Sequence, residues 1–71
     1  MNKIFKNIGQ RLIAKRKQNG LTQQKLAEMT DLNKNYVGNI ERGEKHVTIA
    51  TLNKIAVALN CSMDYFFNDS E

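Results

Sequence analysis

The chain has 71 residues, 41% of them hydrophobic, and carries 11 Lys and Arg against seven Asp and Glu. This length predicts one small domain, residues 1–71, with enough apolar residues to form a core. The single Cys61 excludes an internal disulfide, and no apolar run approaches the roughly 18 residues that cross a bilayer.

The charge is distributed unevenly along the chain. Residues 1–54 hold all 11 basic residues and four acids, whereas residues 55–71 hold only three acids. A basic body with an acidic end indicates a polyanionic partner for the body. The charged amino terminus, MNKIFKNIG, lacks the apolar block of a signal peptide. We therefore expect a soluble cytoplasmic protein with no membrane partner.

Five helices are predicted, near residues 4–18, 23–30, 34–42, 49–59 and 63–67. Each of the last four begins with a small polar N-cap, preceded by an apolar residue that can pack four positions after the cap. These pairs are Leu21-Thr22, Leu32-Asn33, Val47-Thr48 and Cys61-Ser62. The helices end where a left-handed residue is needed, at Gly20, Asp31, Gly43 and Asn60. Asp31 takes that conformation at some strain, since Asp is only a moderate left-handed former.

Helical spacing assigns one face of each helix to the core. The expected core positions are Phe5, Ile8, Leu12, Leu26, Ala27, Met29 or Thr30, Val37, Ile40, Ile49, Leu52, Ile55, Ala56, Leu59, Met63 and Phe66. No segment alternates like a strand, so the expected fold class is all-α.

The outer face of the third helix is polar and cationic. With Val37 and Ile40 inward, the opposite face gathers Lys34, Asn35, Gly38, Asn39 and Arg42. A glycine inside a helix costs about 1 kcal/mol relative to Ala, which a closely approaching surface would explain. Asn can pair with the N6/N7 edge of adenine, and Lys can donate to guanine O6/N7. Composition alone is equally compatible with a merely solvated polar face.

The arrangement of the second and third helices favours DNA binding. A short helix, a tight turn and a second helix with a cationic outer face form a helix-turn-helix over about residues 22–42. Residues 8–67 resemble the Xre/Cro-type, lambda-repressor-like DNA-binding domains, which are compact five-helix folds. The landmarks are Arg16, Leu21-Thr22-Gln23, Leu26-Ala27, Ile40-Glu41-Arg42-Gly43, Thr48, and Leu52 to Leu59. Within that family, NYVGNIERGEKHVT is most similar to the small controller proteins of restriction–modification operons.

The resemblance implies roles for the matching residues. Base edges would be read by Lys34, Asn35, Tyr36 and Asn39. The DNA backbone would be held by Gln23, Gln24, Arg42, Lys45 and His46, because phosphate contacts position a protein whereas base contacts specify its site. Arg16 and Glu41 would form a structural ion pair between the first and third helices. Asp31 stands where the family commonly has Gly, which leaves the angle between the two helices open.

The resemblance also implies a homodimer, formed through about residues 60–71. Its contact residues would be Asn60, Met63, Tyr65 and Phe67. Tyr65, Phe66 and Phe67 cannot all enter one small core, so some aromatic surface stays exposed at this end. A two-fold dimer would place its reading helices about 34 Å apart on a pseudo-palindromic duplex site.

The sequence offers no catalytic residues and no metal site. Ser62 and Cys61 lack a base partner, and His46 with Cys61 does not make a zinc ligand set. We expect no enzyme activity, cofactor or small-molecule ligand, and double-stranded DNA as the partner of a homodimeric, autoregulatory transcription regulator. The alternatives are an antitoxin of the same fold that also binds a toxin protein, a phage-type repressor, and a pure protein-interaction module. The basic body and the exposed amide face argue against the last.

Overall fold

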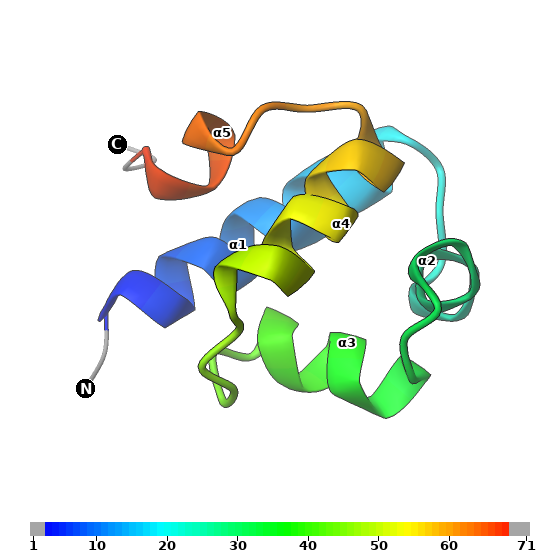
Figure 1. Ribbon diagram of the computed structural model, residues 1–71, viewed down its shortest axis with the longest axis horizontal. Coiled ribbons are helices and arrows are strands. Elements are labelled where there is room, and N and C mark those ends of the chain that lie inside the picture. Colours follow the sequence, from blue (N-terminus) through cyan, green and yellow to red (C-terminus); the bar gives the residue numbers. More distant parts are fainter. Residues whose placement is uncertain (1–2, 69–71) are drawn as a thin grey trace.

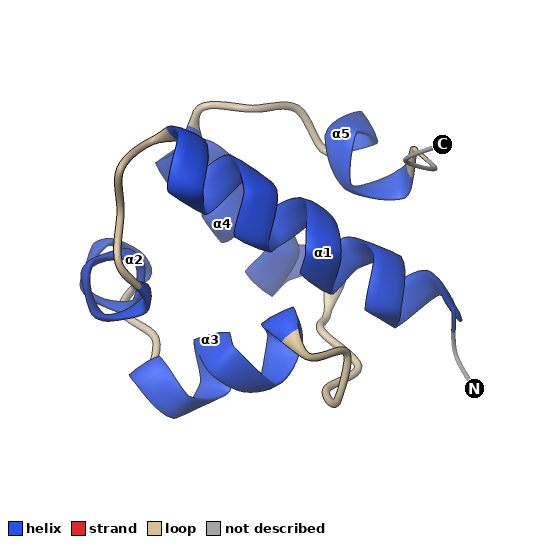
Figure 2. Cartoon of the chain, turned by 180° about the vertical axis from the view of Figure 1, so that it is seen from behind, coloured by secondary structure: helices blue, strands red, loops and turns tan. Residues whose placement is uncertain are grey.

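The computed structural model describes residues 3–68, which form five α-helices and contain no strand (Figures 1 and 2). The helices are α1 (Lys3–Gln18), α2 (Gln23–Thr30), α3 (Lys34–Glu41), α4 (Ile49–Leu59) and α5 (Asp64–Phe67). The predicted all-α class is confirmed, and no predicted boundary is wrong by more than one residue. The part of the predicted dimerisation segment beyond residue 68 lies outside the described residues. Within residues 3–68, no helix combines the length and apolar character needed to cross a membrane.

Three of the four predicted N-caps are present: Thr22, Asn33 and Thr48. Their side-chain oxygens accept hydrogen bonds from the backbone N–H groups of Lys25, Asn35 and Thr51, at 3.0, 2.7 and 3.1 Å respectively. The prediction for Ser62 is wrong, because Met63 occupies the cap position of α5 with no side-chain hydrogen bond. The N–H of Tyr65, which a Ser62 cap could have bound, already donates to the Ser62 carbonyl at 3.2 Å.

The predicted left-handed residues all have that conformation. Gly20 and Gly43 have φ values of 70° and 77°, and Asp31 and Asn60 have φ values of 59° and 58°. The N–H of Asp31 donates back to the last carbonyls of α2, as expected for a left-handed helix end. Asp31 therefore makes the turn into α3 in a backbone conformation that favours glycine.

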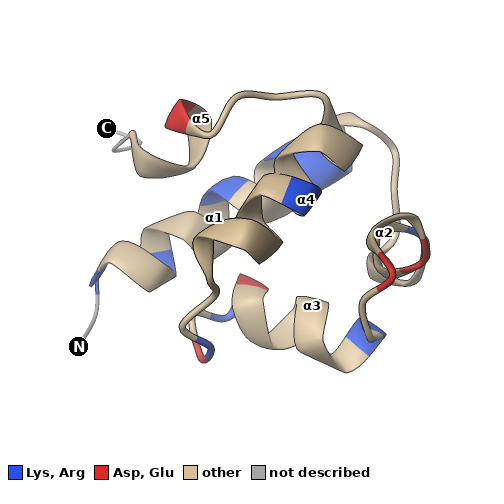
Figure 3. Cartoon of the chain, viewed as in Figure 1, with Lys and Arg blue, Asp and Glu red and all other residues tan. Residues whose placement is uncertain are grey.

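The helices place α3 and α5 on opposite sides of the molecule. The α3 helix packs against α1 and α2, the α5 helix against α1, and the α4 helix against α2. Both views show α3 and the loop after it at the bottom and α5 at the top (Figures 1 and 2). The α3 helix begins with the basic Lys34, whereas the α5 helix begins with the acidic Asp64 (Figure 3).

The end of α3 is fixed tightly against α1. A Cβ atom at Gly9 would lie only 2.4 Å from the carbonyl oxygen of Glu41 and 2.6 Å from that of Ile40. These backbone atoms cannot move aside as a flexible side chain can. Gly9 therefore allows α1 to cross directly over the last turn of α3, which sets the position of that helix in the fold.

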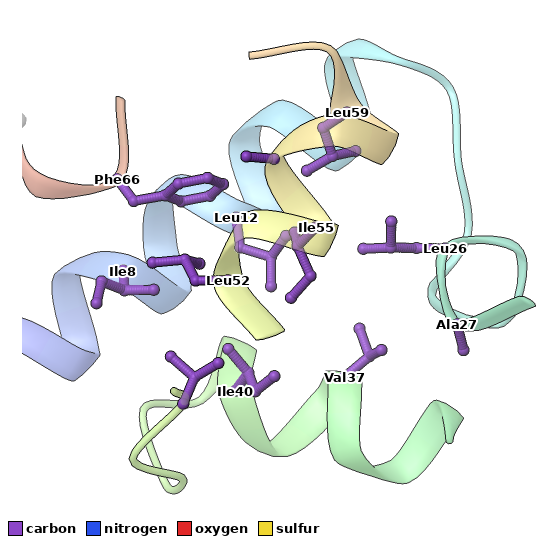
Figure 4. Packing of buried hydrophobic residues seen from close by; sticks show 12 residues of the cluster. Ile8, Leu12, Leu26, Ala27, Val37, Ile40, Leu52, Ile55, Leu59 and Phe66 are labelled. Carbon is purple, nitrogen blue, oxygen red and sulfur yellow. The ribbon is translucent and has the colours of Figure 1, made fainter. Parts of the chain in front are cut away.

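Twelve buried apolar side chains form the core between the helices (Figure 4). They are Ile8, Leu12, Leu26, Ala27, Val37, Ile40, Val47, Leu52, Ile55, Ala56, Leu59 and Phe66. Two further predicted core residues, Phe5 and Met63, are half-buried and pack against this cluster. Most of the predicted core is therefore correct.

One core assignment is wrong, and one alternative left open by the sequence is decided. The Ile49 side chain is 67% exposed, because it belongs to the first turn of α4, where Leu52 takes the inward position. Of the two alternatives at the end of α2, Met29 is 48% exposed and Thr30 is buried. Burial of the Thr30 hydroxyl is possible because it donates to the Leu26 carbonyl at 2.8 Å.

Candidate nucleic-acid interface

The outer face of α3 presents polar side chains unequally. Val37 and Ile40 are buried, and they anchor α3 to the core. Lys34 and Asn35 are exposed at its first turn, and Asn39 is half-buried one turn later. Tyr36, the fourth predicted base-reading residue, is half-buried and packs against the core. The first turn of α3 is therefore the part most open to a partner.

Gly38 does not belong to the open face, contrary to the sequence prediction. It is buried, and a Cβ atom there would lie 3.3 Å from a guanidinium nitrogen of Arg42 and 3.7 Å from the side-chain nitrogen of Gln23. The close surface over Gly38 is thus formed by two side chains of the chain itself. Helical spacing puts Gly38 on the side of α3 away from Val37 and Ile40, but it cannot show that other side chains cover this position.

A hydrogen-bond network around Glu41 connects the first three helices. Arg16 Nε lies 2.6 Å from Glu41 Oε2, and a second guanidinium nitrogen of Arg16 donates to Glu41 Oε1 at 3.2 Å. Arg16 also donates to the Leu21 carbonyl at 2.9 Å. The side chains of Arg16 and Glu41 are only 11% and 4% exposed. The ion pair expected from the sequence therefore exists as a nearly buried contact between α1 and α3.

Gln23 is the third member of this network, a role that no local sequence pattern indicates. Its side-chain Nε2 donates to Glu41 Oε1 at 2.7 Å. The family resemblance implies that Gln23 binds a phosphate, and the residue is half-buried. Because Gln23 begins α2 and Glu41 ends α3, no local spacing rule connects them. The contact fixes the start of α2 against the end of α3.

Two residues predicted to bind the DNA backbone, Gln24 and Arg42, contact carboxylates that are close to them in the sequence. The exposed Gln24 side chain donates to Glu28 at 3.1 Å. Arg42 pairs with Glu44 at 3.2 Å and also donates to the Asn39 side-chain oxygen. Both partners of the Arg42–Glu44 pair are more than half exposed, and pairs of this kind contribute about 0–1 kcal/mol. Arg42 can therefore exchange Glu44 for a phosphate at little cost.

The other two predicted backbone-binding residues lie in the loop after α3. Lys45 and His46 are exposed there. The ring of His46 stacks on that of Phe5 in α1, with centroids 4.5 Å apart and planes 14° apart. This contact fixes the loop next to the first turns of α1.

The predicted dimer residues are only partly available on the surface. Asn60 is exposed, Met63 is half-buried, and Phe67 is 49% exposed. Tyr65 is engaged within the chain: its hydroxyl donates to the Arg11 carbonyl at 3.1 Å, and Arg11 Nε donates to the Tyr65 carbonyl at 2.8 Å. The Arg11 guanidinium also lies 4.1 Å from the centre of the Tyr65 ring. Tyr65 therefore attaches α5 to α1, a role that the sequence did not reveal.

Comparison with known proteins gives consistent matches. The helix-turn-helix family HTH_3 matches residues 12–66. The control protein C.SmaI of Serratia marcescens is 47% identical over 45 residues, which make up 63% of this chain and 54% of that protein. The chain thus spans about half the length of C.SmaI. The control protein C.MunI of Mycoplasma sp. is 33% identical over 72 aligned residues, 100% of this chain and 97% of that protein.

Solved structures agree with these matches. The restriction–modification controller protein C.AhdI from Aeromonas hydrophila has a TM-score of 0.85 and 36% identity, over 89% of this chain and 96% of that chain. The controller C.Esp1396I, solved as a tetramer in complex with its natural 35 base-pair operator, has a TM-score of 0.84 and 28% identity, over 94% of this chain and 88% of that chain. With its α2–turn–α3 unit and these matches, the chain belongs to the HTH_3 helix-turn-helix family.

Proposed function

We propose that the chain is a transcription regulator that binds duplex DNA sequence-specifically as a homodimer, with α3 in the major groove. The observation that carries this proposal is the exposure of Lys34 and Asn35 on the first turn of α3, a helix fixed from behind by Val37 and Ile40. In helix-turn-helix proteins the first residues of the second helix reach base edges. Catalysis has no part in the proposed role.

The contacts divide into reading and anchoring. Asn35 pairs with an adenine edge, and Lys34 donates to a guanine edge. Asn39 reads a further base once Arg42 releases its amide oxygen, and Tyr36 contacts the backbone or a thymine methyl group. The anchoring residues flank α3 on both sides: they are Gln23 and Gln24 at the start of α2, and Arg42, Lys45 and His46 in the loop. The start of α2 suits a phosphate because helix amino ends attract anions.

The homodimer forms through the C-terminal end of the described chain, with Asn60, Met63 and Phe67 as contact residues. Phe67 is 49% exposed and so leaves apolar surface at this end, and burial between two copies removes it from water. Since α5 lies opposite α3 (Figures 1 and 2), its acidic Asp64 stays away from the DNA phosphates. Tyr65 supports this contact indirectly, by attaching α5 to α1.

The regulated genes are, in our proposal, those of a restriction–modification operon that includes the gene of the regulator itself. Support comes from the names of the matched proteins: C.SmaI and C.MunI are control proteins, and C.AhdI and C.Esp1396I are restriction–modification controllers. C.Esp1396I binds its operator as a tetramer. We therefore also propose that dimers of this protein assemble on adjacent DNA sites.

Sedimentation equilibrium, with the protein alone and with a duplex selected from a random pool, tests the homodimer. We expect a dimer of two chains that occupies one inverted repeat. Phe67→Ser should weaken dimerisation and DNA affinity together, because it removes apolar contact area. Val57→Ser is the matched control, since Val57 is 72% exposed and lies outside the proposed interface. Full-affinity binding by single chains would contradict the homodimer.

A further inference from the structure

The first turn of α1 lies directly beside the loop that follows α3. A Cβ atom at Gly43 would be 3.0 Å from Lys6 Cα and 3.3 Å from the Lys6 backbone nitrogen. The backbone of the loop and that of α1 are therefore in contact, with no side chain between them. The neighbouring residue, Phe5, stacks on His46 at 4.5 Å between ring centroids. Two independent contacts thus hold the start of α1 and the loop together as one surface.

This joint surface carries an excess of positive charge. Its charged residues are Lys3, Lys6, Arg42, Glu44 and Lys45. The only carboxylate among them, that of Glu44, already pairs with Arg42 at 3.2 Å. Lys3 and Lys6 are both exposed, and neither takes part in a salt bridge within residues 3–68. Figure 3 shows Lys and Arg positions in blue along α1 and in the loop after α3.

We propose that Lys6 binds a DNA phosphate next to the phosphates held by Lys45 and His46, so that the anchoring surface extends onto α1. This assignment rests on the proposed function. Each DNA strand presents one phosphate for about every 3.4 Å of helix axis, so a lysine beside the loop has a second phosphate within reach of its flexible stem. Lys3, one turn earlier on the same face of α1, extends the positive surface in the same direction.

The position of Lys6 does not depend on the flexibility of the loop. Gly9, one turn further along α1, packs on the carbonyl groups that end α3. The reading helix, the loop and the first turn of α1 therefore keep one relative arrangement, and Lys6 approaches the duplex whenever α3 enters its groove. The contact would add affinity for all sequences and would not alter base preference, since it is made to the backbone.

The test measures affinity for a selected duplex against salt concentration for Lys6→Gln, Lys6→Arg and Lys17→Gln. Lys17 is the matched control: it is an exposed lysine at the opposite end of α1. Each lost phosphate contact makes the slope of log K against log salt less steep by about 0.9. A dimer loses two such contacts, so its slope becomes less steep by about two. We expect Lys6→Gln alone to show this less steep slope. Its affinity at about 0.1 M salt should also be at least tenfold lower than that of the wild type. Lys6→Arg should keep the wild-type slope.

Thermal unfolding of Lys6→Gln should match that of the wild type, because the side chain is exposed. If the wild type binds its duplex and Lys6→Gln keeps the full slope, the assignment of Lys6 is wrong and the proposed function stands. Equal losses for Lys6→Gln and Lys17→Gln would also overturn it, since the effect would then reflect net charge alone. A wild type that binds no duplex would overturn the proposed function and this assignment together.

Discussion

Glu41 Oε2 lies 2.6 Å from Arg16 Nε, and the two side chains are only 4% and 11% exposed. Gln23 also donates to Glu41, from the start of α2. One carboxylate at the end of α3 thus receives hydrogen bonds from α1 and α2, the two helices against which α3 packs. We infer that this network sets the angle at which α3 is presented to DNA.

Removal of Arg16 should therefore be severe for the fold. Arg16→Met leaves the Glu41 carboxylate nearly buried without its cation, which costs about 3–5 kcal/mol in comparable pairs. Urea unfolding followed by circular dichroism measures this loss of unfolding free energy. A variant that is already unfolded at about 25 °C without urea would also agree with the prediction. The double variant Arg16→Met/Glu41→Leu should be more stable than the single one, because apolar replacements of buried pairs are often tolerated. A single variant within about 1 kcal/mol of the wild type would show that the pair is well solvated.

Two glycines in helices should respond to alanine in opposite directions. At Gly9 the added Cβ would meet backbone oxygens at 2.4 and 2.6 Å, so Gly9→Ala should destabilise the fold by about 1–3 kcal/mol. At Gly38 the nearest atom, at 3.3 Å, belongs to the end of the exposed Arg42 side chain, which can move aside. Gly38→Ala should then stabilise α3 by up to about 1 kcal/mol, the difference in helix propensity. Thermal unfolding of both variants decides this, and equal shifts would contradict the packing described.

Local patterns were sufficient to predict most of the fold. The caps at Thr22, Asn33 and Thr48 and the left-handed ends such as Asn60 depend on residues only a few positions apart, so their chemistry is visible in the sequence. The predicted Ser62 cap is absent because α5 has a single turn. The N–H group that Ser62 could have capped, that of Tyr65, already donates to a backbone carbonyl. Short elements leave little room for such rules.

The candidate site was predicted less completely, because its geometry depends on contacts between distant residues. The outward direction of Lys34 and Asn35 follows from the inward positions of Val37 and Ile40. The bond from Gln23 to Glu41, which are 18 positions apart, and that from Arg11 to Tyr65, which are 54 apart, follow from no spacing rule. Such contacts appear only when the helices are packed.

Asn35→Ala and Lys45→Ala should separate reading from anchoring. The Asn35 side chain is exposed. Within residues 3–68 the backbone N–H of Asn35 donates to the capping side chain of Asn33, and the Asn35 side chain itself forms no hydrogen bond. Asn35→Ala should lose about 1–3 kcal/mol per half-site on the preferred sequence and relax preference at one base pair. Lys45→Ala should weaken all sequences alike and lower the salt slope by about one per chain. Competition binding with single-base variants of the duplex measures both, and identical behaviour would show that the division is wrong.

Cys61 should react slowly with thiol reagents. Burial raises the pKa of the Cys61 thiol above its ordinary value, and the charge of nearby Lys15 only partly offsets this. At a given pH near 8, a smaller fraction is therefore thiolate, the reactive form, than in a free cysteine. Reaction with a disulfide reagent should be slower than for glutathione and should accelerate as the pH rises. A rate equal to that of glutathione at pH 8 would contradict the burial of this thiol.

Selection of bound sequences from a random duplex pool, followed by affinity of the winner against salt, tests the central claim most directly. If α3 reads DNA in a two-fold dimer, the pool should yield an inverted repeat whose half-sites lie about one turn, 34 Å, apart. Affinity for that duplex should fall steeply with salt, since several phosphates are neutralised. A pool that shows no enrichment, or binding that ignores sequence, would contradict the account and favour a protein partner for this surface.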